Sequence, residues 1–147
     1  MVREKMKRQQ GRNSLTKILQ EVFEKNEEVQ FAYLYGSVAM RAQTLESDID
    51  VAVYLKSMNI NDFVRTEEKL SIALIMRLHN DRVDLRVLNA LPFLMQYTVL
   101  RDGILIFSRN ELERVDFETQ VMIRFFDLKP YLDEYRRTLS LRIRGSL

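Results

Sequence analysis

Two aspartates at alternate positions, Asp48 and Asp50, are the residues of this sequence best placed to do chemistry. They open the segment 49–55, which alternates and then becomes continuously apolar, a pattern that predicts a β-strand. Residues two apart in a strand point to the same face, so the two carboxylates should stand about 6 to 7 Å apart on that face. Such a pair favours a hard divalent cation, magnesium or manganese.

A third aspartate, Asp84, lies between apolar neighbours in the segment 83–88, which also predicts a strand. If the two strands are adjacent, Asp84 would lie alongside the pair. Three carboxylates in one place repel one another unless cations lie between them. We therefore expect Asp48, Asp50 and Asp84 to bind two metal ions and to be the catalytic residues.

A Gly-Ser turn, Gly36 and Ser37, directly follows a predicted buried strand at 29–35. Gly36 has no Cβ, so a ligand can approach its backbone, and Ser37 offers both an N–H and a hydroxyl. If a short helix follows, its free N–H groups and positive dipole end would attract phosphate.

A nucleoside triphosphate fits this combination of turn and carboxylates. Its β and γ phosphates would lie on the turn, magnesium would bridge them to the aspartate pair, and the α phosphorus would face Asp84. Arg41, four residues beyond Ser37, could reach a phosphate, although its side chain could equally point to solvent.

The rest of the chain predicts alternating helices and strands. The expected elements are a helix at about 14–26, strands at 29–35, 49–55, 83–88 and 104–107, a turn with a short helix up to about 46, a helix at 61–78, and a helix that Pro92 opens and Gly103 ends. An amphipathic tail of one or two helices follows from about 111, and Pro130 should kink or split it near Leu128. Tyr33 and Tyr35, in the first strand, are assigned to the core.

Length and composition indicate one globular domain. The chain has 147 residues, of which 46% are hydrophobic and 30% charged, and no linker separates a core at about 14–107 from the helical tail at about 109–147. With no Cys, a disulfide or a thiolate metal site is excluded. No signal peptide and no run of about 20 apolar residues is present, so we expect a cytoplasmic protein without a membrane partner.

The motif of Gly-Ser, ten residues and Asp-x-Asp resembles that of the minimal nucleotidyltransferase family, within the DNA polymerase beta-like superfamily. Ser47, before the first acid, also matches the family. One departure is that Ala39, Met40 and Arg41 stand where the family commonly has Ala-Arg-Gly. The resemblance implies an α/β (α+β) fold with a mixed four-stranded sheet flanked by helices, two magnesium ions, and Asp84 as the third metal ligand.

The resemblance also implies a function: transfer of AMP from ATP to a hydroxyl. Similar proteins are antitoxins that attach AMP to a tyrosine of a partner RNA-cleaving toxin of the HEPN family. Two alternatives stay open at this point, namely an antitoxin that acts by contact alone, and transfer to RNA or a small molecule. The sequence does not decide whether the protein forms a homo-oligomer.

Overall fold

A mixed four-stranded sheet forms the centre of the computed structural model, which describes residues 2–36, 48–56 and 58–145. Within these ranges the strand order is β3-β2-β1-β4. The strands are β1 (Val29–Tyr35), β2 (Ile49–Leu55), β3 (Val83–Val87) and β4 (Ile104–Ser108). β2 pairs with β3 in parallel, whereas β1 pairs with β2 and β4 in antiparallel fashion. The mixed sheet that the resemblance implies is therefore confirmed.

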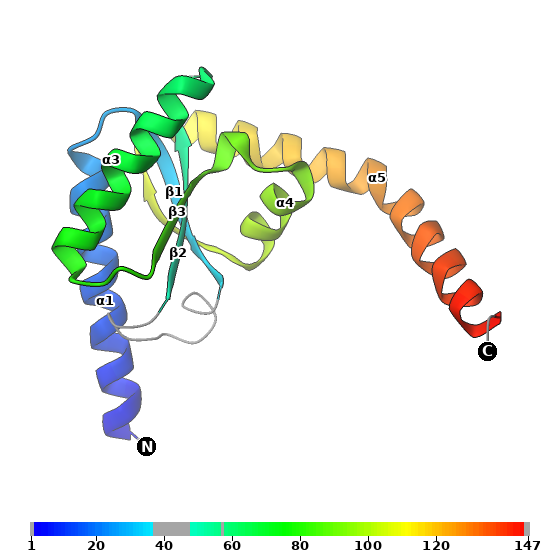
Figure 1. Ribbon diagram of the computed structural model, residues 1–147, viewed down its shortest axis with the longest axis horizontal. Coiled ribbons are helices and arrows are strands. Elements are labelled where there is room, and N and C mark those ends of the chain that lie inside the picture. The colour runs from blue at the N-terminus through cyan, green and yellow to red at the C-terminus, as the bar shows by residue number, and fades with distance from the viewer. Residues whose placement is uncertain (1, 37–47, 57, 146–147) are drawn as a thin grey trace.

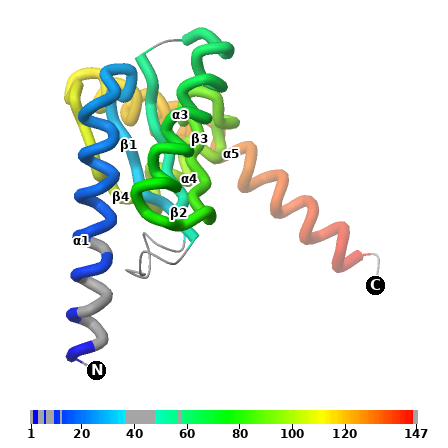
Figure 2. The backbone as a smooth tube through the Cα atoms, turned by 60° about the vertical axis from the view of Figure 1, so that its left-hand side comes forward, coloured from blue at the N-terminus to red at the C-terminus, as the bar shows by residue number. Residues whose placement is uncertain are grey.

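Two pairs of helices cover the two faces of this sheet (Figure 1). On one face lie α1 (Val2–Glu24) and α3 (Ile60–Leu78), and Figure 2 shows the same two helices side by side in front of the strands. On the other face lie α4 (Phe93–Asp102) and α5 (Glu111–Gly145), with a short 3-10 helix at Leu88–Ala90 leading into α4. The sheet is thus the middle layer of three.

The alternation of side chains along β2 separates the two faces chemically. Ile49, Val51 and Val53 are fully buried and pack in the cluster beneath α1 and α3. That cluster contains Leu15, Leu19, Val22 and Phe23 of α1 and Phe63, Leu70, Leu74 and Leu78 of α3. The alternate residues of β2 face α4 and α5 instead.

The face toward α4 and α5 holds a smaller, aromatic core. Phe31 stacks on Tyr54 with ring centroids 4.5 Å apart, and Tyr97 of α4 stacks on Phe125 of α5 at 3.6 Å. The hydroxyl of Tyr33 donates a hydrogen bond to Glu118 of α5. Burial raises the pKa of Tyr33 well above its ordinary value, so the hydroxyl keeps the proton that ties α5 to the sheet.

The two long helices differ from the sequence predictions in different ways. α1 begins at Val2 rather than near residue 14, because the polar lead is rich in Arg, Lys, Gln, Glu and Met, which favour helices. α5 continues through Pro130 as one helix. Of the two predicted effects of Pro130, a kink or a split of the tail, the split is therefore wrong. Figure 1 shows that α5 bends and extends away from the sheet. No helix in the described ranges combines the length and the apolar character needed to cross a membrane.

The cluster under α1 and α3 should carry much of the folding free energy. Leu70 is fully buried there, whereas Met76 on the same helix is 71% exposed. We expect Leu70→Ala to lower the free energy of unfolding by about 2 to 5 kcal/mol, because it removes apolar contacts and leaves a cavity. Urea unfolding measures this, and Met76→Ala, the matched control, should change it by less than about 1 kcal/mol. Equal effects of both substitutions would contradict the assignment of this core.

Candidate active site

Three side chains form a row across neighbouring strands at one end of the sheet. Asp50 of β2 pairs in register with Tyr35 of β1 on one side and with Asp84 of β3 on the other. Directly opposed residues share a face, and neighbouring strands lie about 4.8 Å apart. The structure thus brings Asp50 and Asp84 together, as the sequence predicts.

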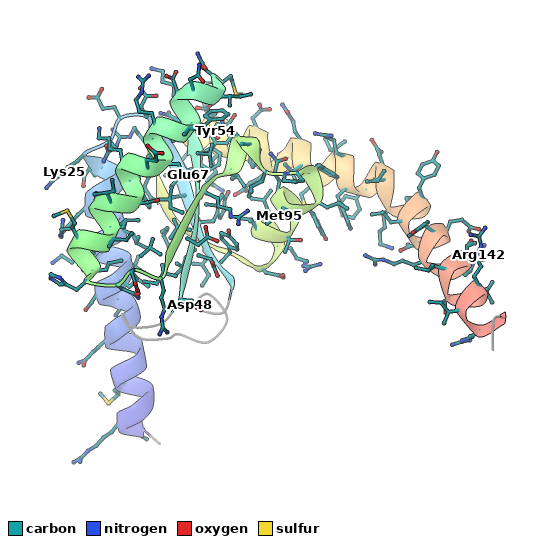
Figure 3. All side chains as sticks on the ribbon, in the orientation of Figure 1. Lys25, Asp48, Tyr54, Glu67, Met95 and Arg142 are labelled. Carbon is teal, nitrogen blue, oxygen red and sulfur yellow. The ribbon has the colours of Figure 1, made fainter. Side chains whose placement is uncertain are left out.

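Asp48 extends this row along β2. It lies just before the strand, on the same side as Asp50, and Figure 3 places it at the opposite end of β2 from Tyr54. A backbone hydrogen bond of 3.0 Å, from the N–H of Ile49 to the carbonyl of Arg82, joins β2 to the chain just before β3 at this point. The backbone directly after Asp48 is therefore fixed to the chain before β3, while the side chain of Asp48 stays 69% exposed.

Gly36 borders the row where β1 ends. Its φ is +70°, a left-handed conformation that other residues adopt only at a cost. A Cβ at this position would come within 2.3 Å of the Oδ2 of Asp50. The backbone conformation therefore favours glycine here, and a larger residue would displace the carboxylate of Asp50, which the missing side chain leaves room for.

The electrostatics of the row show an excess of negative charge. Burial raises the pKa of Asp50 above its ordinary value, and the charges of Asp84 and then Asp48 raise it further. The pKa of Tyr35 rises to about 12, first because the side chain is half-buried and then because of Asp84 and Asp50. Tyr35 therefore keeps its proton at neutral pH and can donate a hydrogen bond into the site.

Two arginines partly offset this charge at the outer carboxylates. The Nε of Arg86 lies 3.4 Å from the Oδ1 of Asp84, and the Nε of Arg82 lies 3.9 Å from the Oδ1 of Asp48. All four side chains are about half exposed or more. Charge pairs as exposed as these are weak and rearrange easily.

The donor set suits a hard divalent metal ion. All three acids offer carboxylate oxygens, and a cation would relieve the repulsion that raises the pKa of Asp50. As the side chains stand, no group of three acidic, His or Cys residues in the described part of the chain is close enough to hold an ion. Metal binding would require the exposed side chains of Asp48 and Asp84 to rotate toward Asp50.

Sequence patterns located part of this site. Ser37 and Arg41, the other two candidate nucleotide-binding residues, lie outside the described residues, as does the short helix expected up to residue 46. Tyr33 is buried, as expected, whereas Tyr35 is a half-buried member of the acidic row. Neither Arg82 nor Arg86 was singled out, although Arg86 shares the strand parity of Asp84, which is the signal that would have identified it.

Known structures with similar folds come from toxin–antitoxin complexes. A chain from the crystal structure of a toxin–antitoxin with AMP-PNP has a TM-score of 0.63 at 20% identity, and the match covers 88% of this chain and 98% of that chain. A chain from the tri-AMPylated Shewanella oneidensis HEPN toxin in complex with MNT antitoxin has a TM-score of 0.56 at 20% identity, covering 93% and 98%. At these identities the likeness concerns the fold.

A further chain, from the toxin–antitoxin MntA-HepT, has a TM-score of 0.55 at 20% identity and covers 92% of this chain and 98% of that chain. No curated protein sequence matches the chain significantly. The family described as "Polymerase beta, Nucleotidyltransferase" matches residues 17–112, which include all of β1 to β4 and the acidic row. Since this match spans well over half of the sequence, the chain belongs to the polymerase beta nucleotidyltransferase family.

Proposed function

We propose that this protein is a metal-dependent nucleotidyltransferase that transfers AMP from ATP to a tyrosine hydroxyl of a partner HEPN toxin, and thereby acts as its antitoxin. The observation that carries the proposal is the row in which Gly36 and Asp50 lie next to each other and Asp84 lies opposite Asp50. Family membership supports nucleotidyl transfer. The toxin–antitoxin complexes with similar folds, one with AMP-PNP and one with an AMPylated HEPN toxin, support the donor and the acceptor.

Each residue of the row has a role in this reaction. Gly36 leaves room for the triphosphate beside Asp50, where Ser37 and Arg41 are the further candidate nucleotide ligands. Asp48, Asp50 and Asp84 would hold two magnesium ions, with manganese as a substitute. Bound there, the metal ions would lower the pKa of the attacking hydroxyl and stabilise the charge that develops on the α phosphate.

The arrangement of strands supports separate positions for the donor and the acceptor. Gly36 directly follows β1, an inner strand flanked by β2 and β4, whereas β3, which carries Asp84, is at the edge of the described sheet. We assign the triphosphate to the Gly36 side and the acceptor hydroxyl to the exposed Asp84 side. Asp84 is then the carboxylate nearest the nucleophile.

The first test is transfer of label. The protein, magnesium and ATP labelled at the α phosphate should label a HEPN toxin encoded beside it, whereas Asp50→Asn should be at least about a hundredfold slower, because metal-held charge stabilisation is lost. Tyrosine-to-phenylalanine substitution in the toxin identifies the acceptor residue. If Asp50→Asn neutralises the toxin as well as the original protein does, the antitoxin acts by contact and the catalytic proposal fails.

The same substitution should separate activity from stability. The pKa of Asp50 is raised in the folded state, so its carboxyl favours folding below the ordinary value of 3.8, and that contribution is lost as pH rises through the folded value. In EDTA at pH 7, Asp50→Asn should therefore have a free energy of unfolding equal to or greater than that of the original protein. The difference in free energy of unfolding between the variant and the original protein should become smaller as pH falls toward 3.8.

Added magnesium should make the original protein more stable than Asp50→Asn. It should raise the melting temperature of the original protein and have little effect on Asp50→Asn, because the cation offsets a repulsion that the variant lacks. Differential scanning fluorimetry with and without EDTA measures both. Equal stabilisation of the two proteins by magnesium would place the metal elsewhere.

Gly36 provides an independent test of the row. Gly36→Ala should lower the free energy of unfolding by about 1 to 2 kcal/mol because of its left-handed backbone, and by more if Asp50 cannot move away from the new methyl group. Transfer should fall further than the stability loss explains, because the methyl group and the carboxylate of Asp50 compete for the same space. Gly145→Ala, where an added Cβ meets nothing within 4 Å, is the control.

A further inference from the structure

The strand β3 presents charged side chains of opposite sign on one face. Asp84 and Arg86 alternate with the buried residues Leu85 and Val87, so both point to the side of the sheet where Asp50 lies. Arg82, just before the strand, has the same parity. An acidic site that needs cations thus carries two cations of its own along its edge.

The charge of Arg86 affects Asp50 and Tyr35 as well as Asp84, its direct partner. Its Nε is 3.4 Å from the Oδ1 of Asp84, and its positive charge also lowers the pKa of Asp50 and of Tyr35 against the opposing effects of burial and carboxylates. No ion pair to Asp50 itself occurs within the described ranges. Among the residues that the structure describes, Arg86 is therefore the cation that partly offsets the charge around Asp50.

Arg82 is less closely coupled to the row. Its Nε lies 3.9 Å from the Oδ1 of Asp48, and its side chain is 68% exposed, whereas that of Arg86 is 49% exposed. Exposed pairs at longer distance contribute little. Arg86 is the closer arginine and lies next to Asp84, the carboxylate on the acceptor side. We therefore expect the loss of Arg86, and not that of Arg82, to change metal binding at the site.

We propose that Arg86 is a positioning residue that competes with a divalent cation for Asp84. Its guanidinium contacts the Asp84 carboxylate while the metal is absent, and this contact weakens when Asp84 turns toward Asp50 to bind an ion. Arg86 thereby sets the metal concentration at which the carboxylate row becomes competent. The inference rests on the proposed metal-dependent function and goes beyond it by assigning a role to a residue outside the family motif.

Chemistry distinguishes this competition from a general effect of charge. A guanidinium that contacts the Asp84 Oδ1 uses part of the acceptor capacity and offsets part of the charge of that carboxylate, so a divalent ion that binds there gains less. A distant cation affects metal binding only through a field that water and salt screen. Removing Arg86 should therefore tighten metal binding, whereas removing a remote arginine should not.

The experiment measures the binding of Mn²⁺ to the protein in the absence of nucleotide by isothermal titration calorimetry. Arg86→Gln should lower the Kd for Mn²⁺ by roughly two- to tenfold, the range expected for removing one competing charge from an exposed pair. Arg86→Lys, which keeps the charge, should stay within about twofold of the original protein. Arg136→Gln is the matched control, because Arg136 is an exposed residue in the C-terminal half of α5. The C-terminal end of this helix extends away from the sheet (Figure 1).

A second readout is the magnesium concentration that supports half-maximal AMP transfer, which should fall in Arg86→Gln. Unchanged Mn²⁺ affinity in folded Arg86→Gln, checked by circular dichroism, would overturn the inference and leave the proposed function standing. An equal gain in affinity in Arg136→Gln or Arg86→Lys would also overturn it. If the original protein binds no Mn²⁺ without nucleotide, the role of Arg86 as a competitor fails, whereas the metal-dependent function is decided separately by the AMP-transfer assay with and without EDTA.

Discussion

The site depends on the register of β2. Ile49, Val51 and Val53 are fully buried under α1 and α3, so a slip by one residue would turn them to the opposite face and drive Asp50 into the apolar cluster. Burial of these three side chains therefore fixes Asp50 on the opposite face. The parallel pairing with β3 and the antiparallel pairing with β1 then place it between Asp84 and the end of β1.

This arrangement works against stability at the site itself. Partial burial and two neighbouring carboxylates raise the pKa of Asp50, and Gly36 has the left-handed backbone that brings the turn close to the same carboxylate. The apolar cluster and the aromatic contacts of α5 with the sheet stabilise the fold against this local cost. Strain and repulsion concentrated at one end of an otherwise well-packed sheet are typical of a functional site.

Local sequence patterns predicted most of the elements because strong local signals mark them. β1 and β2 begin and end at the predicted residues, and Gly103 caps α4 as expected, with its N–H bonded to the carbonyl of Val99 at 2.8 Å. Helix length was harder to predict. The start of α1 depends on intrinsic helix preference without a cap signal, and α5 tolerates Pro130 where it is exposed to water, which can satisfy the freed carbonyl.

The sequence predicts the three carboxylates of the candidate site better than it predicts the residues that surround them. Alternation along a strand is enough to group Asp48 with Asp50, but the adjacency of β2 and β3, which brings in Asp84, is a property of topology that the resemblance supplied. Tyr35 follows the pattern of a core residue, and only its register with Asp50 places it in the row. Strand parity places Arg86 on the same face as Asp84, but the contact between the two depends on side-chain rotation, which no sequence pattern specifies.

The edge position of β3 connects this geometry with the kind of acceptor proposed. A hydroxyl carried by a folded protein needs an approach that the sheet and its helices leave open, and the half-exposed Asp84 on the edge strand provides one. The inner position of β1 suits the triphosphate, which is small and needs close backbone contact at Gly36. A nucleotide held on the inner side and a macromolecule approaching at the edge can then meet at Asp50, which lies between the two.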